Sequence, residues 1–336
     1  MQRIRLETST WIYLAAAVLL CILPFIFTGR SIQFLIMQIF IFGIFAMSYD
    51  LLLGYTGIVS FGHTMFFGIG AYSVAVMMDR YEPTIFYLII GVVVAVIIAA
   101  IVSFIVGILT LRLKSHFYAM LTLALAGLFL VAAEKWRGLT GGTEGFTLQI
   151  PEFLKERVNL YLLCLVTLVL LFFGLRRFTN SPLGRVLMAI RENEGRTESL
   201  GYHVLHYRVI VSVVSGVVAS IAGALYILSL RFIDTSVFAT DVTLDALLMT
   251  IIGGVGTLIG PIIGAALIEF AHHFLSDLAE VHWIFERWII LFGSIYILVV
   301  IFFPKGIVGS LHMFFTKKRT KKQKQDSKDT SKRMAG

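Results

Sequence analysis

Charged residues are scarce in this chain of 336 residues: Asp, Glu, Lys and Arg together make up 14%, whereas hydrophobic residues make up 58%. The mean hydropathy is +0.89. A soluble globule of this size needs more polar sequence to cover its surface, whereas a surface in contact with lipid needs none. The composition therefore excludes a soluble protein and indicates an integral membrane protein.

Signatures of catalysis are also missing. The two cysteines, Cys21 and Cys164, lie inside apolar segments, which gives no indication of disulfide or metal chemistry. No His, Asp and Glu cluster has metal-site spacing, no G-x-x-x-x-G-K-[ST] sequence occurs, and no Ser-His-Asp set falls in one accessible region. We therefore expect a chain that is not an enzyme and that holds no metal or cofactor. If ATP drives it, another chain binds the ATP.

Long apolar segments dominate what is present. Many approach the about 20 residues that cross a hydrocarbon core, so the sequence predicts an all-α polytopic membrane protein. We expect a bundle of about 8 to 10 transmembrane helices with Gly-interrupted or re-entrant segments. The expected spans lie near 11–27, 32–53, 63–79, 84–111, 116–133, 159–175, 209–230 and 288–303, with a Gly-interrupted stretch at 243–268.

Basic residues set the expected orientation. The net charge is +8, and nine Lys or Arg against two Asp fall within 312–336. We interpret 1–311 as the membrane domain and 312–336 as a basic, disordered cytoplasmic tail that meets anionic lipid rather than nucleic acid. The positive-inside rule places Arg112, Lys114 and the segment 176–208 in the cytoplasm, with both termini inside. An even number of crossings must then follow residue 208, so 243–268 contributes none or two.

Two of the apolar segments are broken by glycine, one in each half of the chain. Such discontinuous helices commonly build a transport pathway, although tight helix packing explains the glycines equally well. For His63, bracing of a neighbouring group is the favoured interpretation. The candidate pathway residues are Tyr55, Thr56, Gly57, Ser60 and His63 in the first segment and Gly253, Gly254 and Gly256 in the second.

Few charges fall within the spans. Ion-coupled carriers generally place charged side chains near the middle of the membrane, whereas Asp50 and Asp245 lie near segment ends and Glu269 follows one. This pattern weakens an ion-coupled mechanism without excluding it. For Asp50 we expect a carboxylate that reaches interfacial water, with a place at the pathway mouth as the alternative.

A polar segment at 178–208 contains a short amphipathic helix. Asn180 or Ser181 can cap it, Pro182 suits its first position, and the helix is expected to end near Gly195. Its apolar residues recur at helical spacing, while the charged residues point elsewhere. The apolar stripe would bind a groove on a soluble partner or lie at the headgroup surface.

Ten short blocks, taken in order, resemble the permease subunits of ABC importers for branched-chain amino acids, M type. Each block is weak alone, but their shared order covers nearly the whole chain except its two ends. The blocks are 54–57 (GYTG), 60–63 (SFGH), 66–72 (FFGIGAY), 118–124 (YAMLTLA), 139–145 (LTGGTEG), 181–185 (SPLGR), 189–194 (AIRENE), 199–202 (SLGY), 253–261 (GGVGTLIGP) and 303–306 (FPKG).

The resemblance implies an ATP-driven importer in a prokaryotic cytoplasmic membrane. Its partners would be a second permease of H type, two ATPases that bind ATP and Mg²⁺, and an extracytoplasmic binding protein that meets 134–159 and 231–241. The segment matching 181–201 would be the loop that couples the permease to the ATPases. Its candidate residues are Gly184, Arg185, Ala189, Arg191, Glu192, Asn193, Glu194, Leu200 and Gly201.

Three departures from the family pattern stand out. The family commonly has Asn where this chain has Asp50, Ala-Ala where it has Arg196-Thr197, and Ser-Pro where it has Asp234-Thr235. A permease for urea or short amides shares nearly all these blocks and is the close alternative. A stand-alone ion-coupled transporter is the alternative from a different class.

Overall fold

The chain folds as a helical bundle in a computed structural model that describes residues 13, 15, 17–25, 29–110, 115–279, 293, 306, 307 and 309. Helices account for nearly all of it, and the two short strands hold two residues each. The elements are α2 (Arg30–Thr56), α3 (Thr64–Arg80), α4 (Ile85–Thr110), α5 (Ser115–Lys135), α6 (Arg137–Thr140), η1 (Gly142–Glu144), β1 (Phe146–Thr147), α7 (Glu152–Lys155), α8 (Arg157–Thr179), α9 (Pro182–Glu192), α10 (Glu194–Ser199), α11 (Val204–Leu230), β2 (Phe232–Ile233), η2 (Thr235–Phe238), α12 (Thr240–Gly253) and α13 (Ile259–Ala279).

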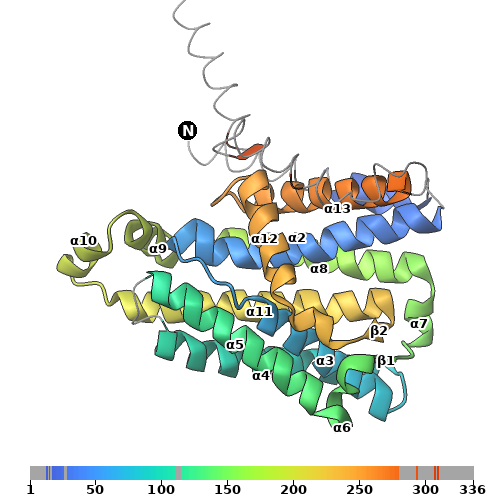
Figure 1. Cartoon of the computed structure of the whole chain (residues 1–336). Coiled ribbons are helices and arrows are strands. Elements are labelled where there is room, and N and C mark those ends of the chain that lie inside the picture. The colour runs from blue at the N-terminus through green and yellow to red at the C-terminus, as the bar shows by residue number, and fades with distance from the viewer. Residues whose placement is uncertain are drawn as a thin grey trace, which may run out of the picture.

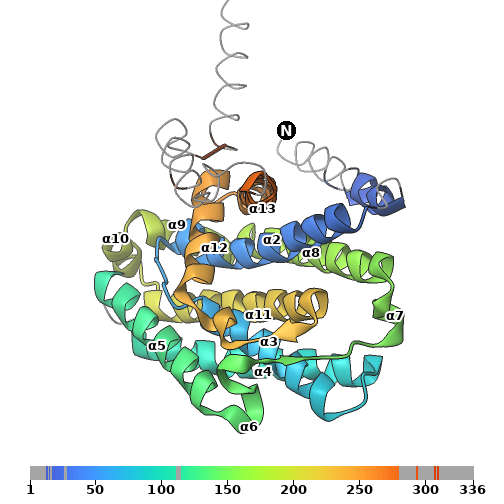
Figure 2. The same ribbon diagram turned by 45° about the vertical axis from the view of Figure 1, so that its right-hand side comes forward.

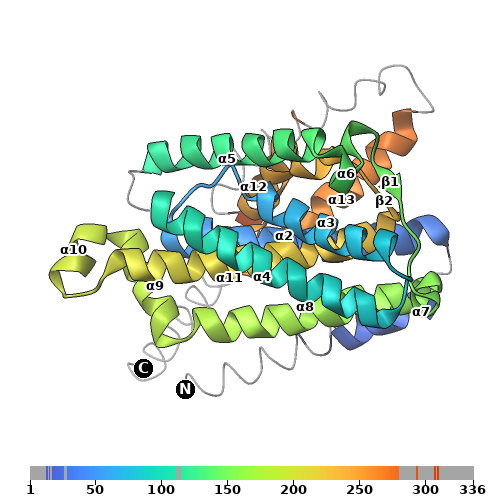
Figure 3. The ribbon, with the colours of Figure 1, turned by 90° about the horizontal axis from the view of Figure 1, so that it is seen from below.

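The long helices run lengthwise between two ends of the bundle (Figures 1 and 2). One end carries α9 and α10, and we call it the α9 end. The opposite end carries α6, α7 and the two strands, and we call it the α7 end; the view from below shows the same division (Figure 3). Within the described residues, five helices are long and apolar enough to cross a membrane: 30–56, 85–109, 117–135, 157–179 and 204–230. The prediction of an all-α polytopic membrane protein is confirmed.

Five of the expected spans correspond to these helices, and the span at 63–79 corresponds to the shorter helix α3. The span at 11–27 is described only at residues 13, 15 and 17–25, whereas the span at 288–303, apart from residue 293, and the tail at 312–336 lie outside the described residues. The glycines at 243–268 predict an interrupted helix, and the structure confirms the interruption. The stretch is α12, with 14 residues, followed by a turn and by α13.

The first break lies between α2 and α3. The chain leaves α2 at the α9 end and returns toward the middle of the bundle as an irregular segment without helix or strand, and α3 begins there (Figure 1). Helix α3 therefore has only 17 residues. Its first residue, Thr64, donates from its backbone N–H to Thr243 Oγ1 at 2.9 Å and from its hydroxyl to the Val237 carbonyl at 2.8 Å. The start of α3 thus meets the start of α12, so two short helices begin beside each other in the core.

Glycines let α3 pack closely against α11. A Cβ on Gly70 would lie 2.6 Å from the Ser220 carbonyl carbon, and a Cβ on Gly223 would lie 2.8 Å from that of Phe67. Backbone-to-backbone contact of this kind requires small residues at a helix crossing. The residues at 57–63 are not helical, whereas the glycines inside α3 allow close packing.

Candidate functional site

The predicted pathway residues of the first break are turned into the protein, except for the exposed Gly57. The Thr56 hydroxyl donates to the Leu52 carbonyl at 2.6 Å within its own helix. Tyr55 is 8% exposed, and its side chain reaches Thr179 at the end of α8. Ser60 is 1% exposed and accepts from the Gly62 N–H at 3.4 Å. These side chains are buried and make their contacts within the bundle.

His63 braces α2, as favoured from the sequence. It is fully buried, and its Nε2 lies 2.8 Å from Ser48 Oγ. The Ser48 hydroxyl donates its proton to the Phe45 carbonyl at 2.6 Å. Because a hydroxyl has one proton to give, we assign His63 as the donor from Nε2, which leaves Nδ1 as a neutral acceptor. No described residue bonds to that Nδ1.

The glycines of the second break form a tight turn between α12 and α13 at the α9 end. Gly254 and Gly256 have φ of 126° and 81°, a region that favours glycine. Leu258 follows with φ of 54°, at a cost of about 1 to 2 kcal/mol for a residue with a side chain. A Cβ on Gly253 would lie 3.0 Å from the Cα of Gly260, so the two sides of the turn touch.

Asp50 holds this turn, which corrects the expectation that it reaches interfacial water. Its side chain is fully buried. Oδ1 accepts from the Gly256 N–H at 2.7 Å, and Oδ2 accepts from the Leu258 N–H at 3.3 Å. A carboxylate that accepts backbone N–H groups from a turn with left-handed residues stabilises that turn. The Asp50 carboxylate, which departs from the family pattern, therefore offsets the free-energy cost of the left-handed backbone conformation at Leu258.

The amphipathic helix of the polar segment is α9. Ser181 caps it by accepting from the Gly184 N–H at 3.3 Å, and it ends at Glu192 rather than near Gly195. Asn193 instead caps the next helix, α10, by accepting from the Arg196 N–H at 2.9 Å. A Cβ on Gly184 would lie 2.7 Å from the Cα of Thr179, so α9 begins in direct contact with the end of α8.

The apolar stripe of α9 packs partly on this chain itself. Leu187 and Ile190 are 0% and 2% exposed, so neither is free to enter a groove on a partner. Arg185, Ala189 and Glu192 are exposed on the other side of the helix. The prediction that the whole stripe meets a partner or the lipid surface is therefore wrong for its buried half.

Helix α10 forms the tip of the α9 end (Figure 3). Glu194 accepts two hydrogen bonds from Arg208 of α11, at 2.7 and 2.8 Å, in a bidentate pair. Leu200 is 73% exposed, and Gly201, with φ of 89°, turns the chain into α11.

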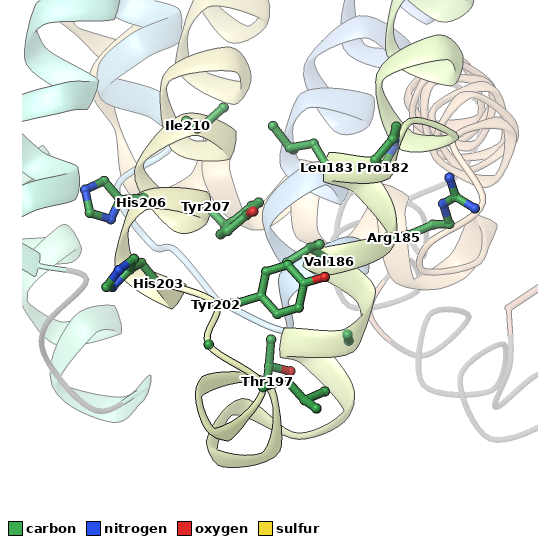
Figure 4. Close-up of a pocket in the computed structure, with 13 residues that line it drawn as sticks. Pro182, Leu183, Arg185, Val186, Thr197, Tyr202, His203, His206, Tyr207 and Ile210 are labelled. Carbon is green, nitrogen blue, oxygen red and sulfur yellow. The ribbon is translucent and has the colours of Figure 1, made fainter.

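A groove of about 1030 Å³ separates α9 and α10 from the start of α11. Figure 4 shows Tyr202 and Tyr207 between the helices, near Leu183 and Val186. The two tyrosine rings are 6.0 Å apart, edge to face. The lining residues are Pro182, Leu183, Arg185, Val186, Ala189, Thr197, Leu200, Gly201, Tyr202, His203, His206, Tyr207 and Ile210.

Arg191 joins the two predicted residue sets. Its Nη1 donates a hydrogen bond to the carbonyl of Gly54 in α2. A Cβ on Gly256 would lie 3.2 Å from the same nitrogen, and a Cβ on Gly57 would lie 3.3 Å from Arg191 Cγ. Residues predicted for coupling and residues predicted for the pathway therefore meet at one point of the α9 end.

Several polar residues of the core were not singled out from the sequence. Thr64 and Thr243 join the starts of α3 and α12, and Thr122 of α5 accepts from the Phe61 N–H at 3.2 Å. Asp234, which the sequence had already marked as a departure from the family pattern, is only partly buried and caps η2 by accepting from the Ser236 N–H at 3.1 Å. Hydroxyl residues inside apolar helices were the available signal, but their partners lie far away in sequence.

The fold and these junctions define a multi-pass α-helical membrane protein with two broken helices. The family model for the branched-chain amino acid transport system permease component matches residues 31–303. The chain belongs to that family.

Three curated relatives share the name LivM. The high-affinity branched-chain amino acid transport system permease protein LivM of Salmonella typhimurium is 24% identical over 314 residues, which cover 85% of this chain and 71% of the relative. LivM of Escherichia coli is 24% identical, covering 80% and 68%. The probable permease protein LivM of Methanocaldococcus jannaschii is 26% identical, covering 83% and 94%. No solved structure gives a significant match.

Proposed function

We propose that this chain is one permease subunit of an ATP-driven ABC importer that carries branched-chain amino acids across a prokaryotic cytoplasmic membrane. The observation that carries the proposal is the contact between α9, the helix proposed to couple to ATPases, and both broken segments at one end of the bundle. Family membership supports the substrate class.

The α9 end would face the cytoplasm, with both termini on that side. The arginines between Arg176 and Arg208 favour this orientation by the positive-inside rule. Large apolar side chains are exposed there: Met188 is 45% exposed, Leu200 73% and Tyr202 42%. Apolar surface at a water-facing end favours a protein partner. Each of two ATPases would bind ATP and Mg²⁺, and one would meet the α9 groove.

The α7 end would face outward and receive substrate from a binding protein. The two predicted contact loops, 134–159 and 231–241, lie together there because β1 pairs with β2, with Phe146 opposite Ile233 and Thr147 opposite Phe232. An H-type permease would complete the pore, the basic tail at 312–336 would lie on anionic lipid, and this chain would hold no cofactor or metal.

The unwound residues 57–63 and the segment that leads into α12 would form the pathway. Backbone groups of both segments find partners within the bundle, as membrane depth requires: the Phe61 N–H donates to Thr122 Oγ1, and the Val237 carbonyl accepts from the Thr64 hydroxyl. Rearrangement of the two short helices would then alternate access between the α7 and α9 ends.

Transport in proteoliposomes tests the proposal. The liposomes would hold this chain with its partner permease, ATPases and binding protein, and labelled leucine and labelled urea would be compared with and without ATP. ATP-dependent leucine uptake is the expected result. Urea uptake alone would replace the substrate class, and uptake by this chain without ATPases would overturn the importer assignment.

A further inference from the structure

The contacts of Arg191 at the α9 end form a compact network that joins three separate segments. Helix α2 supplies the Asp50 carboxylate and the Gly54 carbonyl, the α12–α13 turn supplies Gly254 to Leu258, and α9 supplies Arg191. We call this set the latch. Both broken segments reach the latch, because the first break starts at Gly57, beside Arg191, and the second break is the α12–α13 turn itself.

The last carbonyls of α2 explain why Arg191 lies there. The Leu52 carbonyl accepts from the Ile58 N–H at 3.1 Å, and the Leu53 carbonyl accepts from the Gly57 N–H at 3.2 Å. The next carbonyl, that of Gly54, accepts from Arg191. A cation at a helix C-terminus also interacts favourably with the helix dipole. Arg191 thereby supplies a hydrogen-bond donor to one of the last carbonyls of α2.

Close packing ties the end of α2 to the turn. A Cβ on Gly54 would lie 2.6 Å from the Gly256 nitrogen and 2.7 Å from the Gly256 Cα. A Cβ on Gly306 would lie 2.6 Å from the Gly254 nitrogen, so Gly306 also touches the turn. The turn therefore has little freedom while α2 and Arg191 hold their positions.

The two charged residues of the latch differ in their freedom to move. Asp50 is fully buried and is bonded to two backbone N–H groups. Arg191 belongs to an exposed stretch of α9, and its guanidinium lies within electrostatic range of Asp50. A long cation at a surface regains water when it leaves, whereas a buried carboxylate does not. We therefore expect Arg191, rather than Asp50, to leave its partners when the latch opens.

We infer that the latch is the gate at the α9 end: movement of α9 withdraws Arg191 from Gly54, which frees the α12–α13 turn and opens the pathway at that end. This inference rests on the proposed function, because it takes α9 as the segment that the ATPases move. It adds the residue contact through which that movement reaches the pathway.

Thiol labelling of the complete importer complex tests the latch without measuring transport. In a chain with Cys21→Ala and Cys164→Ala, Ser60→Cys places a thiol in the first break, where the native side chain is 1% exposed. A membrane-impermeant maleimide is added without ATP, and its attachment to this chain is followed by mass. Arg191→Gln should raise the labelling rate about tenfold, or about 1.4 kcal/mol.

Two further variants sharpen the result. Arg177→Gln removes an exposed positive charge that is not part of the latch, and should label at the parent rate. Asp50→Asn keeps one acceptor oxygen and should label at an intermediate rate. Labelling of Arg191→Gln at the parent rate would overturn the inference. If Arg191→Gln melts far below the parent, Arg191→Lys replaces it, with faster labelling expected and the parent rate again contradicting the latch.

Addition of ATP and Mg²⁺ to the parent separates the two proposals. Faster labelling with ATP supports the latch and its link to the ATPases. If ATP speeds labelling but Arg191→Gln does not, the latch is wrong and the importer assignment stands. If Arg191→Gln speeds labelling but ATP does not, the gate is right, and the link between α9 and the ATPases fails.

Discussion

Arg191 of α9 donates a hydrogen bond to the carbonyl of Gly54 of α2, and 137 positions separate the two residues. The contact joins a helix at the tip of the bundle to the point where the first membrane segment breaks. If separate ATPases drive this permease, as proposed above, a signal must pass from a surface helix to the pathway, and this contact would supply a direct route.

Gly54 should tolerate no side chain. Gly54→Ala would place a methyl group against the Gly256 backbone, and overpacking of this kind typically costs about 1 to 3 kcal/mol. Thermal unfolding of the purified complex measures the loss. Gly174→Ala in α8 is the matched control, because a Cβ there meets no other atom within 4 Å and should keep or slightly raise the melting temperature. Equal melting temperatures for both variants would contradict the close packing of α2 on the turn.

The start of α3 depends on the Thr243 oxygen. Thr243→Val removes the acceptor for the buried Thr64 N–H, and an unsatisfied buried donor costs about 1 to 3 kcal/mol. Thr243→Ser keeps the oxygen and should restore most of the stability. The comparison uses thermal unfolding again, and an equally stable Val variant would show that the two short helices do not need this bond.

His63 should affect folding more than transport. His63→Leu removes the bond to Ser48 and leaves a buried hydroxyl without it, so we expect a lower melting temperature and nearly normal leucine uptake per folded complex. Uptake is normalised to the amount of intact complex in the liposomes. Lost uptake at an unchanged melting temperature would instead place His63 in contact with substrate.

The pair of Glu194 and Arg208 should matter for coupling rather than for stability. The Glu194 side chain is 48% exposed, and ion pairs at such sites contribute about 0 to 1 kcal/mol. Glu194→Ala should leave assembly intact but lower the leucine carried per ATP hydrolysed, because α10 loses its connection to α11. An unchanged ratio would count against a role of α10 in coupling.

Helix positions followed directly from the sequence, because apolar length and glycine breaks determine them locally. The capping of α9 by Ser181 and the division of 243–268 into α12 and α13 were predictable for the same reason. The glycine breaks indicated the pathway set, and the resemblance to the permease family indicated the coupling set; residues of both sets meet at the latch.

The contacts themselves were not predictable from one sequence. Asp50 was assigned to interfacial water because it lies near a segment end, whereas the folded chain surrounds it with a turn about 200 residues later. Leu187 and Ile190 have the same helical spacing as a partner-binding stripe, and only the packing of α9 on the bundle shows that they are buried. Periodicity defines a face of a helix but not what covers it.

The central claim, that α9 controls the pathway through Arg191, is tested most directly by the number of leucine molecules carried per ATP hydrolysed in proteoliposomes. A charge-assisted hydrogen bond is worth about 1.5 to 3 kcal/mol, so Arg191→Gln should lower this ratio about tenfold while ATP hydrolysis continues. Arg177→Gln should keep the parent ratio. A parent ratio in Arg191→Gln, with the complex intact, would contradict the claim.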